Sequence, residues 1–360
     1  MGTDSVRTLC THKGKSSARL RRALAEAARR IVTMRAKRGA LEALLISRLV
    51  ALVKNSNGDL RPIGIGEAWR RLLLKTIGTA LRDEVTETAG LKQLAAGQSA
   101  ACEAAIHWMR SQLEAAEMCL FVDASNAFNA AKRLKMLEAV DDFTPTLGRV
   151  SRNVYHHGSD LVLADGTRIR SEEGATQGCP IAMQCYAIGT LPLIEESQTE
   201  GMDQGWYADD SAGIGLVTGV ANWFGRLLLK GPSRGYHVNA RKTVALVRRS
   251  KLAEYHRVFS ELYPNEHSRL RVAVLEDIDA MVMNGDSLPD ELGTRYLGGG
   301  LGGPGFRRQY VSERVRPWVQ DVHGLAEVAK VDPQVAHSLL TQIIVPRWRF
   351  LMRSGMVSRT

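Results

Sequence analysis

Five consecutive apolar residues, from Met118 to Val122, lead directly into Asp123. A continuous apolar run of this length is typical of a short strand buried on both faces, which requires a sheet covered on each side by other elements. A carboxylate at the end of such a strand is costly unless it meets a cation or a hydrogen-bond donor. Asp123 is therefore a candidate cation ligand, with a helix N-cap as the structural alternative.

A second pair of acids is predicted at the tip of a hairpin. The segment Gly205–Leu216 has apolar residues on both sides of Asp209 and Asp210, so both of its strands are expected to be half-buried. If this hairpin lies beside the strand that ends at Asp123, carboxylates from distant parts of the chain come together. Oxygen-only ligation with positions left for substrate phosphates suits Mg²⁺, and two such ions can drive an in-line phosphoryl displacement.

A basic hairpin is predicted around Asn57-Gly58, a dipeptide typical of two-residue turns. With that turn, Lys54 and Arg61 lie directly opposite each other on neighbouring strands. Two facing cations are unfavourable without an anion beside them, and a triphosphate would supply one. The structural alternative is a solvated basic hairpin close to a nucleic-acid backbone.

The charge of the chain favours a polyanionic partner. Lys and Arg number 48 against 38 Asp and Glu, which gives a net charge of +10. Residues 1–48 contain 12 Lys or Arg and 3 acids, and arginines are again frequent from Arg307 onward. A nearly neutral middle with basic flanks is typical of a protein that holds a long nucleic acid at its edges.

Several classes are excluded or disfavoured. No apolar run approaches the length of a membrane span. The 5 cysteines include no CxxC pair and no zinc-finger spacing, which favours a reducing compartment and disfavours structural zinc. The basic helix predicted over Ser17–Met34 also fits a mitochondrial transit peptide, although Glu26 interrupts it.

The remaining pattern predicts an α+β fold, a sheet covered by helices. Helices are expected over Leu41–Leu49, Glu67–Thr86, Ser99–Glu117 and Asn129–Val140, from Pro180 onward and after Asp332-Pro333; a strand over Val244–Arg248; and a hairpin over Leu161–Arg170 that turns at Asp165-Gly166.

Six segments together resemble the reverse transcriptases of non-LTR (LINE-type) retrotransposons. In chain order they are similar to the fingers motif, the first catalytic motif, the template- and nucleotide-binding loop, the catalytic hairpin, the motif after it and the primer grip. The segments are Lys54 with Arg61–Ile63, Phe121–Phe128, Glu173–Pro180, Tyr207–Asp210, Gly235–Thr243 and Tyr296–Gly299. Each is weak alone, but their order is that of the family.

The resemblance implies a right-hand polymerase fold with a two-metal site. Asp123 and Asp209 would bind two Mg²⁺ ions, with Mn²⁺ as an alternative ion. Asp210 would be the supporting acid, and the backbone carbonyl of Ala124 a further ligand.

The resemblance also implies a nucleotide-binding set. Lys54 and Arg61 would hold the triphosphate, and Phe128 would lie under the sugar and exclude a 2′-hydroxyl, unless it is only a core residue. The remaining assignments are Gln177 and Gly178 for the nucleotide and template, Lys242 as a proton donor to pyrophosphate (or simply a solvated lysine), and Leu297 and Gly298 for the primer grip.

The domain organisation expected from the resemblance has four parts: a basic helical extension (1–45), fingers (46–117), a palm (118–290) with a fingers insertion around 140–172, and a primer grip with a helical thumb (291–360). Cys179, Met183 and Gln184 depart from the family pattern, and Pro192 is expected to break or kink the helix that carries them. Since no nicking endonuclease or zinc knuckle is evident, we expect an isolated or truncated polymerase core.

The function predicted is RNA-directed DNA polymerisation, with an RNA template, a DNA or RNA primer and dNTPs as partners and no membrane. The alternative is a catalytically silent or domesticated reverse-transcriptase-like protein that binds RNA; an RNA-templated RNA polymerase is disfavoured by Phe128. The sequence leaves protein partners and compartment open, although basic flanks and a retroelement resemblance favour the nucleus.

Overall fold

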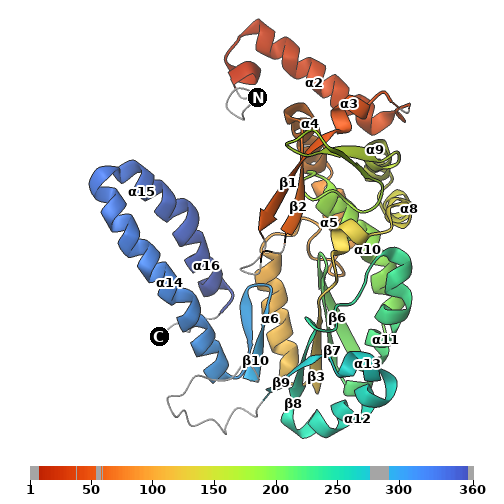
Figure 1. The fold of residues 1–360 in the computed structure, drawn as a ribbon, viewed down its shortest axis with the longest axis vertical. Helices are drawn as coiled ribbons and strands as arrows, with labels where there is room; N and C mark the ends of the chain where they lie inside the picture. Colours follow the sequence, from red (N-terminus) through yellow and green to blue (C-terminus); the bar gives the residue numbers. More distant parts are fainter. Residues whose placement is uncertain (1–7, 38, 54–57, 59, 276–291, 356–360) are drawn as a thin grey trace.

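The computed structural model describes residues 8–37, 39–53, 58, 60–275 and 292–355 (Figure 1). The strands are β1 (Ser47–Val53), β2 (Leu60–Gly66), β3 (Met118–Val122), β4 (Ser159–Val162), β5 (Arg168–Ser171), β6 (Met202–Tyr207), β7 (Asp210–Gly215), β8 (Val244–Arg248), β9 (Arg271–Leu275), β10 (Gly293–Tyr296) and β11 (Gly299–Gly302). The helices are α2 (Lys15–Thr33), α3 (Glu42–Leu45), α4 (Ala68–Ala80), α5 (Arg82–Ala89), α6 (Ala101–Leu113), α7 (Ala127–Ala130), α8 (Arg133–Phe143), α9 (Pro145–Tyr155), α10 (Ala182–Ser197), α11 (Val217–Arg234), α12 (Leu252–Leu262), α13 (Pro264–His267), α14 (Pro304–Val331), α15 (Pro333–Leu339) and α16 (Val345–Arg353), with short turns η1 (Arg249–Lys251) and η3 (Leu340–Ile344).

The centre of the molecule is a five-stranded sheet with the order β6-β7-β3-β8-β9. All five residues of β3 are buried, because alternate side chains enter different cores. Met118, Leu120 and Val122 pack with residues of α10 and α11 on one face. Cys119 and Phe121 pack with residues of α6 on the other. The predicted strand is confirmed, and so is the α+β class.

A smaller sheet, β2-β1-β4-β5, lies above the central one (Figure 1). In it β1 and β2 are antiparallel, with Leu52 opposite Arg61. The predicted facing of Lys54 and Arg61 is therefore wrong, since the strands are offset by two residues from the register that an Asn57-Gly58 turn would give. Lys54 itself lies outside the described residues, as does Asn57.

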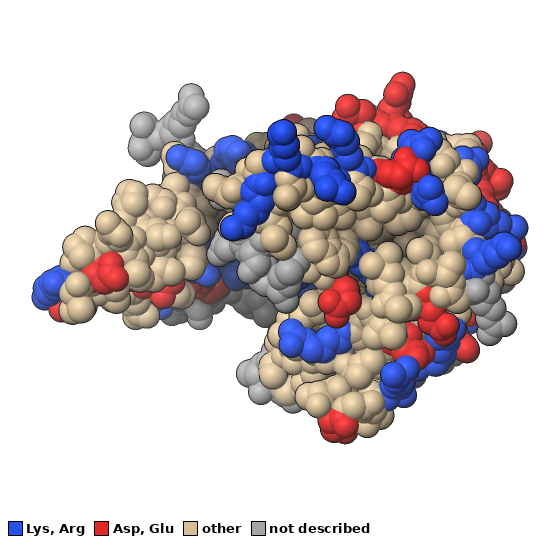
Figure 2. Space-filling model, turned by 90° about the horizontal axis from the view of Figure 1, so that it is seen from above, with Lys and Arg blue, Asp and Glu red and all other residues tan. Residues whose placement is uncertain are grey.

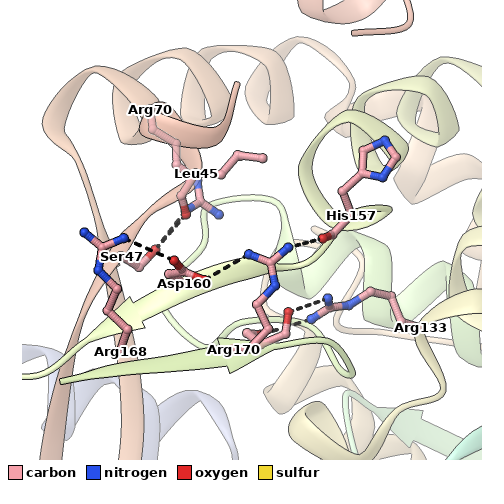
Figure 3. Close-up of polar contacts among 9 residues, drawn as sticks. Leu45, Ser47, Arg70, Arg133, His157, Asp160, Arg168 and Arg170 are labelled. Atoms are coloured by element: carbon pink, nitrogen blue, oxygen red, sulfur yellow. Dashed lines mark hydrogen bonds and ion pairs between the residues drawn. The ribbon is translucent and has the colours of Figure 1, made fainter. Parts of the chain in front are cut away.

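Buried arginines fix this smaller sheet to its helices (Figure 3). Arg70 on α4 donates to the carbonyl of Leu45 at 2.7 Å and to the hydroxyl of Ser47 at 2.8 Å, which anchors the start of β1. Arg133 on α8 donates to the carbonyls of Ser171, Glu173 and Gly174 at 2.7–3.0 Å. Since these carbonyls lie at the end of β5 and directly after it, Arg133 holds the chain on its way to the Gln177–Gly178 loop.

The N-terminal helix α2 packs on α9 and α4 (Figure 1). Asn153 ties its end down: the Asn153 amide donates to the carbonyls of Ile31 and Met34, each at 2.8 Å. The opposite face carries exposed arginines, and Figure 2, seen from this end of the molecule, shows Lys and Arg side chains lying side by side. The predicted amphipathic basic helix is confirmed.

The C-terminal part is a helical hairpin in which α14 leaves the β10–β11 hairpin and the chain returns through α15 and α16 (Figure 1). The helix expected after Asp332-Pro333 is α15, and Asp332 caps it by accepting a 3.0 Å hydrogen bond from the backbone N–H of Val335. Tyr310 and Leu351 join the base of this hairpin to the core beneath β3. The central sheet, the smaller sheet and the helical hairpin have the arrangement expected of a right-hand polymerase fold, while the exact domain boundaries stay a prediction.

Other sequence predictions hold in part. The strand over Val244–Arg248 and the hairpin around Asp165-Gly166 are confirmed. The helix expected over Leu41–Leu49 is only α3, because the chain enters β1 at Ser47. The helices expected over Glu67–Thr86 and Asn129–Val140 are each two helices, α4 with α5 and α7 with α8.

The α10 helix differs from its prediction both at its first residue and at Pro192. It begins at Ala182 instead of Pro180, and it continues past Pro192 to Ser197, so Pro192 does not end it. No helix in the described ranges is both long enough and apolar enough to cross a membrane.

Candidate active site

A cavity of about 650 Å³ opens where β2, the end of β3 and the β6–β7 hairpin meet. Its lining includes nearly all the described residues that the sequence singled out: Arg61, Asp123, Ala124, Phe128, Gln177, Gly178, Asp209, Asp210 and Lys242. Leu297 and Gly298, the residues predicted for a primer grip, are not in this lining. The structure thus brings together residues that are far apart in the sequence.

The acids meet because β3 and β7 are neighbouring antiparallel strands. Val122 lies opposite Ser211, and the register continued by one residue places Asp123 opposite Asp210. The helix-cap alternative for Asp123 is wrong, because Asn126 precedes α7 and no side chain caps that helix. The carbonyl of Asp123 instead accepts a 2.8 Å hydrogen bond from the backbone N–H of Asn239.

The tip of the acidic hairpin is one residue earlier than predicted. Tyr207 pairs with Asp210, so the two-residue loop is Ala208-Asp209 and Asp210 is the first residue of β7. Ala208 has a φ of 55°, a left-handed conformation that costs a non-glycine residue roughly 1–2 kcal/mol. On the far side of the loop, the hydroxyl of Tyr236 contacts Ser211 Oγ at 2.8 Å and donates to the carbonyl of Asp209 at 3.2 Å.

Negative charge is crowded at this end of the cavity. Burial, followed by the charges of Asp209 and Asp123, raises the pKa of Asp210 to about 6, while Arg295 on β10 opposes the shift. Asp210 retains accessible surface at the cavity, so water and ions reach it. The donors are all oxygen, which fits a hard divalent cation. Within the described ranges, no group of three or more His, Cys, Asp or Glu side chains is already arranged as a metal site.

Phe128 lies on α7 and is half-buried. Its ring stacks on Tyr186 of α10, with centroids 4.2 Å apart and planes 18° apart. It packs against the core and also lines the cavity. Phe128 is therefore a core residue that also forms part of the cavity wall, while its role in excluding a 2′-hydroxyl stays a prediction.

The Gln177–Gly178 loop is joined to β2 by its backbone. The N–H of Gly64 donates to the carbonyl of Gln177 at 2.8 Å. Gly178 has a φ of 102°, and a Cβ there would lie 2.6 Å from the carbonyl oxygen of Gly64. Only glycine permits this approach. The same strand carries Arg61, which is exposed at the cavity.

Lys242 lies in the turn between Asn239 and β8, also exposed at the cavity. Its exposure agrees with a lysine that is simply solvated, and its place in the cavity lining agrees with a proton donor to pyrophosphate. The Asn239 N–H that bonds Asp123 fixes this turn to the acidic end of β3.

Leu297 and Gly298 form the turn of the β10–β11 hairpin, with φ values of 45° and 87°. They line a second cavity of about 420 Å³ against α14 and α16, together with Tyr310, Arg314 and Phe350. The hydroxyl of Tyr310 donates to the carbonyl of Gly298 at 2.8 Å. The turn is therefore held against the helical hairpin. Arg295, on β10 before this turn, interacts electrostatically with Asp210.

Sequence reasoning missed Gln93, in the connection between α5 and α6. Gln93 is fully buried, and its side-chain amide bonds both backbone groups of Ala208. No motif or periodicity marks it in the sequence.

No protein-family model matches the sequence, and no curated protein matches it. Among solved structures, the chain is similar to telomerase from Candida tropicalis truncated from its C-terminal domain, with a TM-score of 0.45 and 11% identity over 56% of this chain and 50% of that one. It is also similar to telomerase from Candida albicans in complex with a TWJ fragment of telomeric RNA, with a TM-score of 0.45 and 11% identity over 64% and 47%.

A third similar structure is apo telomerase from Candida tropicalis, with a TM-score of 0.42 and 11% identity over 63% of this chain and 49% of that one. The chain spans about half the length of the solved structures it matches. The narrower resemblance to non-LTR retrotransposon reverse transcriptases rests on the sequence motifs and stays a prediction.

Proposed function

We propose that this chain is an RNA-directed DNA polymerase that adds dNTPs to the 3′-hydroxyl of a DNA or RNA primer on an RNA template. The observation that carries the proposal is the meeting of Asp123 with Asp209 and Asp210 at a cavity whose lining also includes Arg61, Gln177 and Lys242. Carboxylates and cations that line one cavity of this size suit a nucleoside triphosphate held by metal ions.

The proposed metal ligands are Asp123 and Asp209 for two Mg²⁺ ions (Mn²⁺ as an alternative), supported by Asp210 and the carbonyl of Ala124. Bound there, the ions would lower the pKa of the primer hydroxyl and neutralise charge on the leaving group. Since the described residues contain no ready-made three-ligand cluster, substrate phosphates would complete the coordination. Burial, followed by repulsion from Asp209 and Asp123, raises the pKa of Asp210, and a bound cation would relieve the repulsion.

The other residues would position substrate and move protons. Arg61 would bind the triphosphate through its guanidinium, with Lys54 beside it, and Gln177 and Gly178 would border the nucleotide and template. The primer 3′-hydroxyl would give up its proton to solvent as its oxygen forms a bond to the α-phosphorus. The bond between the α-phosphorus and the oxygen that bridges to the β-phosphorus would break at the same time, and the departing pyrophosphate would take a proton from Lys242. Phe128 would exclude a 2′-hydroxyl.

Further parts of the proposal rest on the sequence resemblance. The turn of Leu297 and Gly298 would hold the primer end, and the basic face of α2 would contact the RNA backbone. A retrotransposon origin is part of the proposal on the same ground.

The experiment is primer extension by the purified chain on an RNA template with dNTPs and Mg²⁺, compared with Asp209→Ala. We expect extension by the wild type and a loss of about 1000-fold or more in the variant, as removal of a metal ligand costs several kcal/mol of transition-state stabilisation. Asp203→Ala is the matched control, an exposed acid of the same hairpin far from the tip. No extension together with tight, salt-sensitive RNA binding would identify a catalytically silent RNA-binding protein instead.

A further inference from the structure

The side chain of Gln93 uses all of its hydrogen-bonding capacity. Its Oε1 accepts from the backbone N–H of Ala208 at 2.8 Å and from that of Ala95 at 3.3 Å. Its Nε2 donates to the carbonyl of Ala208 at 3.0 Å and to Thr190 Oγ1 at 3.2 Å. A glutamine amide offers two donor hydrogens and two acceptor positions, and each one has a partner here. No other residue type of this length supplies the same set.

These bonds act on the residue that precedes Asp209. Both peptide groups of Ala208 are held by one amide, so Gln93 imitates a neighbouring strand at the point where the hairpin turns. The adjacent bond from the N–H of Leu94 to the carbonyl of Trp206, at 2.9 Å, extends the same contact along β6. The arrangement fixes the peptide that leads into Asp209.

Ala208 requires such support because its left-handed φ is unfavourable for a residue with a Cβ. Thr190 gives the support a rigid base: it lies on α10, and its own hydroxyl donates to the carbonyl of Ala187 at 2.9 Å. Gln93 therefore connects the hairpin tip to the helix that follows the Gln177–Gly178 loop.

We infer that Gln93 is a positioning residue that sets the orientation of Asp209 for cation binding, acting through the backbone of Ala208. This inference rests on the proposed polymerase function for its catalytic consequence, but its effect on cation binding is measured separately. Without the Gln93 amide, both peptide groups of Ala208 lose these hydrogen bonds, and the left-handed turn that leads into Asp209 is held less firmly.

The test compares Gln93→Met with Gln204→Met in the full chain. Gln204 is a matched control, because its amide also bonds buried groups, among them the indoles of Trp206 and Trp223 at 2.8 and 3.0 Å, but it does not contact the tip. Two quantities are measured below the unfolding temperature of both variants: Mn²⁺ binding by electron paramagnetic resonance, and kcat and KM for dNTP in primer extension.

We expect Gln93→Met to weaken Mn²⁺ binding roughly tenfold or more and to lower kcat by about 100-fold with little change in KM for dNTP. Gln204→Met should lower the unfolding temperature without these effects. Thr190→Val removes only one acceptor from the Gln93 amide and should give a smaller change of the same kind, which provides a readout if Gln93→Met does not fold.

Wild-type Mn²⁺ affinity and kcat in Gln93→Met and Thr190→Val, or losses no larger than those of Gln204→Met, would overturn the inference. A wild type that binds Mn²⁺ but extends no primer would contradict the proposed function while the Mn²⁺ comparison still decides the role of Gln93. A wild type that does neither would overturn both.

Discussion

The ring of Phe128 lies almost parallel to that of Tyr186, with centroids 4.2 Å apart, and one edge of this stack forms part of the cavity wall. The stack fixes a large side chain beside the acids. A sugar bound above it would meet a rigid obstacle, because a half-buried ring stacked on a buried one cannot rotate away without losing contacts.

Replacement of Phe128 by Ala should therefore admit rNTPs. We expect the dNTP preference, measured as the ratio of kcat/KM values, to fall by roughly 10- to 100-fold, the range that steric discrimination of one small group provides. Tyr186→Phe keeps the stacked pair and should leave the preference unchanged. Unaltered sugar selectivity in Phe128→Ala would show that this residue serves only the core.

Arg61→Ala should raise KM for dNTP. A charge-assisted hydrogen bond is worth about 1.5–3 kcal/mol, which corresponds to roughly a 10- to 100-fold effect. Arg48→Ala removes another exposed arginine of the β1–β2 pair, which lies outside the cavity lining, and should have little effect. Equal kinetics of the two variants would argue against triphosphate binding by Arg61.

The pKa of Asp210 predicts a pH-dependent stability in buffer without divalent ions. Because the folded-state pKa is raised from 3.8 to about 6, the folded chain binds a proton more readily than the unfolded chain. This group therefore destabilises the fold above pH 6, and that penalty disappears as the pH falls from 6 toward 4.

Asp210→Asn should consequently raise the unfolding temperature at pH 7.5, with a difference from wild type that shrinks as the pH approaches 4. Asp203→Asn, at an exposed acid of the same hairpin, should show no such trend. A constant difference across this pH range would contradict the cause given for the shift.

Gly178→Ala should destabilise the chain more than Gly166→Ala. Both glycines have positive φ, 102° and 87°, but an added Cβ meets the Gly64 carbonyl only at Gly178, and nothing lies within 4 Å at Gly166. The conformational cost is common to both, so the difference in unfolding free energy in urea, about 1–3 kcal/mol, reports the clash. Similar values for the two variants would mean that the loop moves away from β2 freely.

The exposed face of α2 should contribute to RNA affinity through its unpaired arginines. Arg19 and Arg22 make no ion pair with a described residue, whereas Arg29 and Arg30 are bonded to Glu26. Changing Arg19 and Arg22 to Gln should reduce the slope of log affinity against log salt by up to about 1.4 on single-stranded RNA. The corresponding change of Arg29 and Arg30 should do less, and identical slopes in all variants would place the RNA elsewhere.

Much of the central sheet was predictable because its strands are strongly apolar. The run Met118–Val122 has the length and composition of a buried strand. Asp123, which follows it, meets the acids at the tip of the β6–β7 hairpin because β3 and β7 are antiparallel neighbours. The resemblance of six ordered motifs predicted which residues share one site. The structure places those of them that it describes in the lining of the cavity, except for Leu297 and Gly298.

The wrong predictions are those in which a short sequence pattern was used to infer which residues face each other in the folded chain. The Asn57-Gly58 dipeptide predicts a tight turn, but the register of β1 and β2 depends on packing along the whole pair, and Arg61 lies opposite Leu52. The hairpin turns at Ala208-Asp209 instead of Asp209-Asp210 because a left-handed alanine is stabilised there by contacts from a distant segment. The partners of Gln93 at the hairpin tip and on α10 are more than 90 residues away in the sequence, so no local pattern marks this residue.

The pairing of Val122 with Ser211 also limits how this chain can change in length. Side chains alternate between the two faces of a strand, so one residue inserted within β7 would turn Asp210 to the opposite face and separate it from Asp123. An insertion at the exposed Asp165-Gly166 turn would alter neither strand. Deletions and insertions within β7 should thus disrupt the site, whereas those at the Asp165-Gly166 turn should leave it intact. In this part of the sheet the length of the strand is therefore constrained more strongly than the identity of its residues.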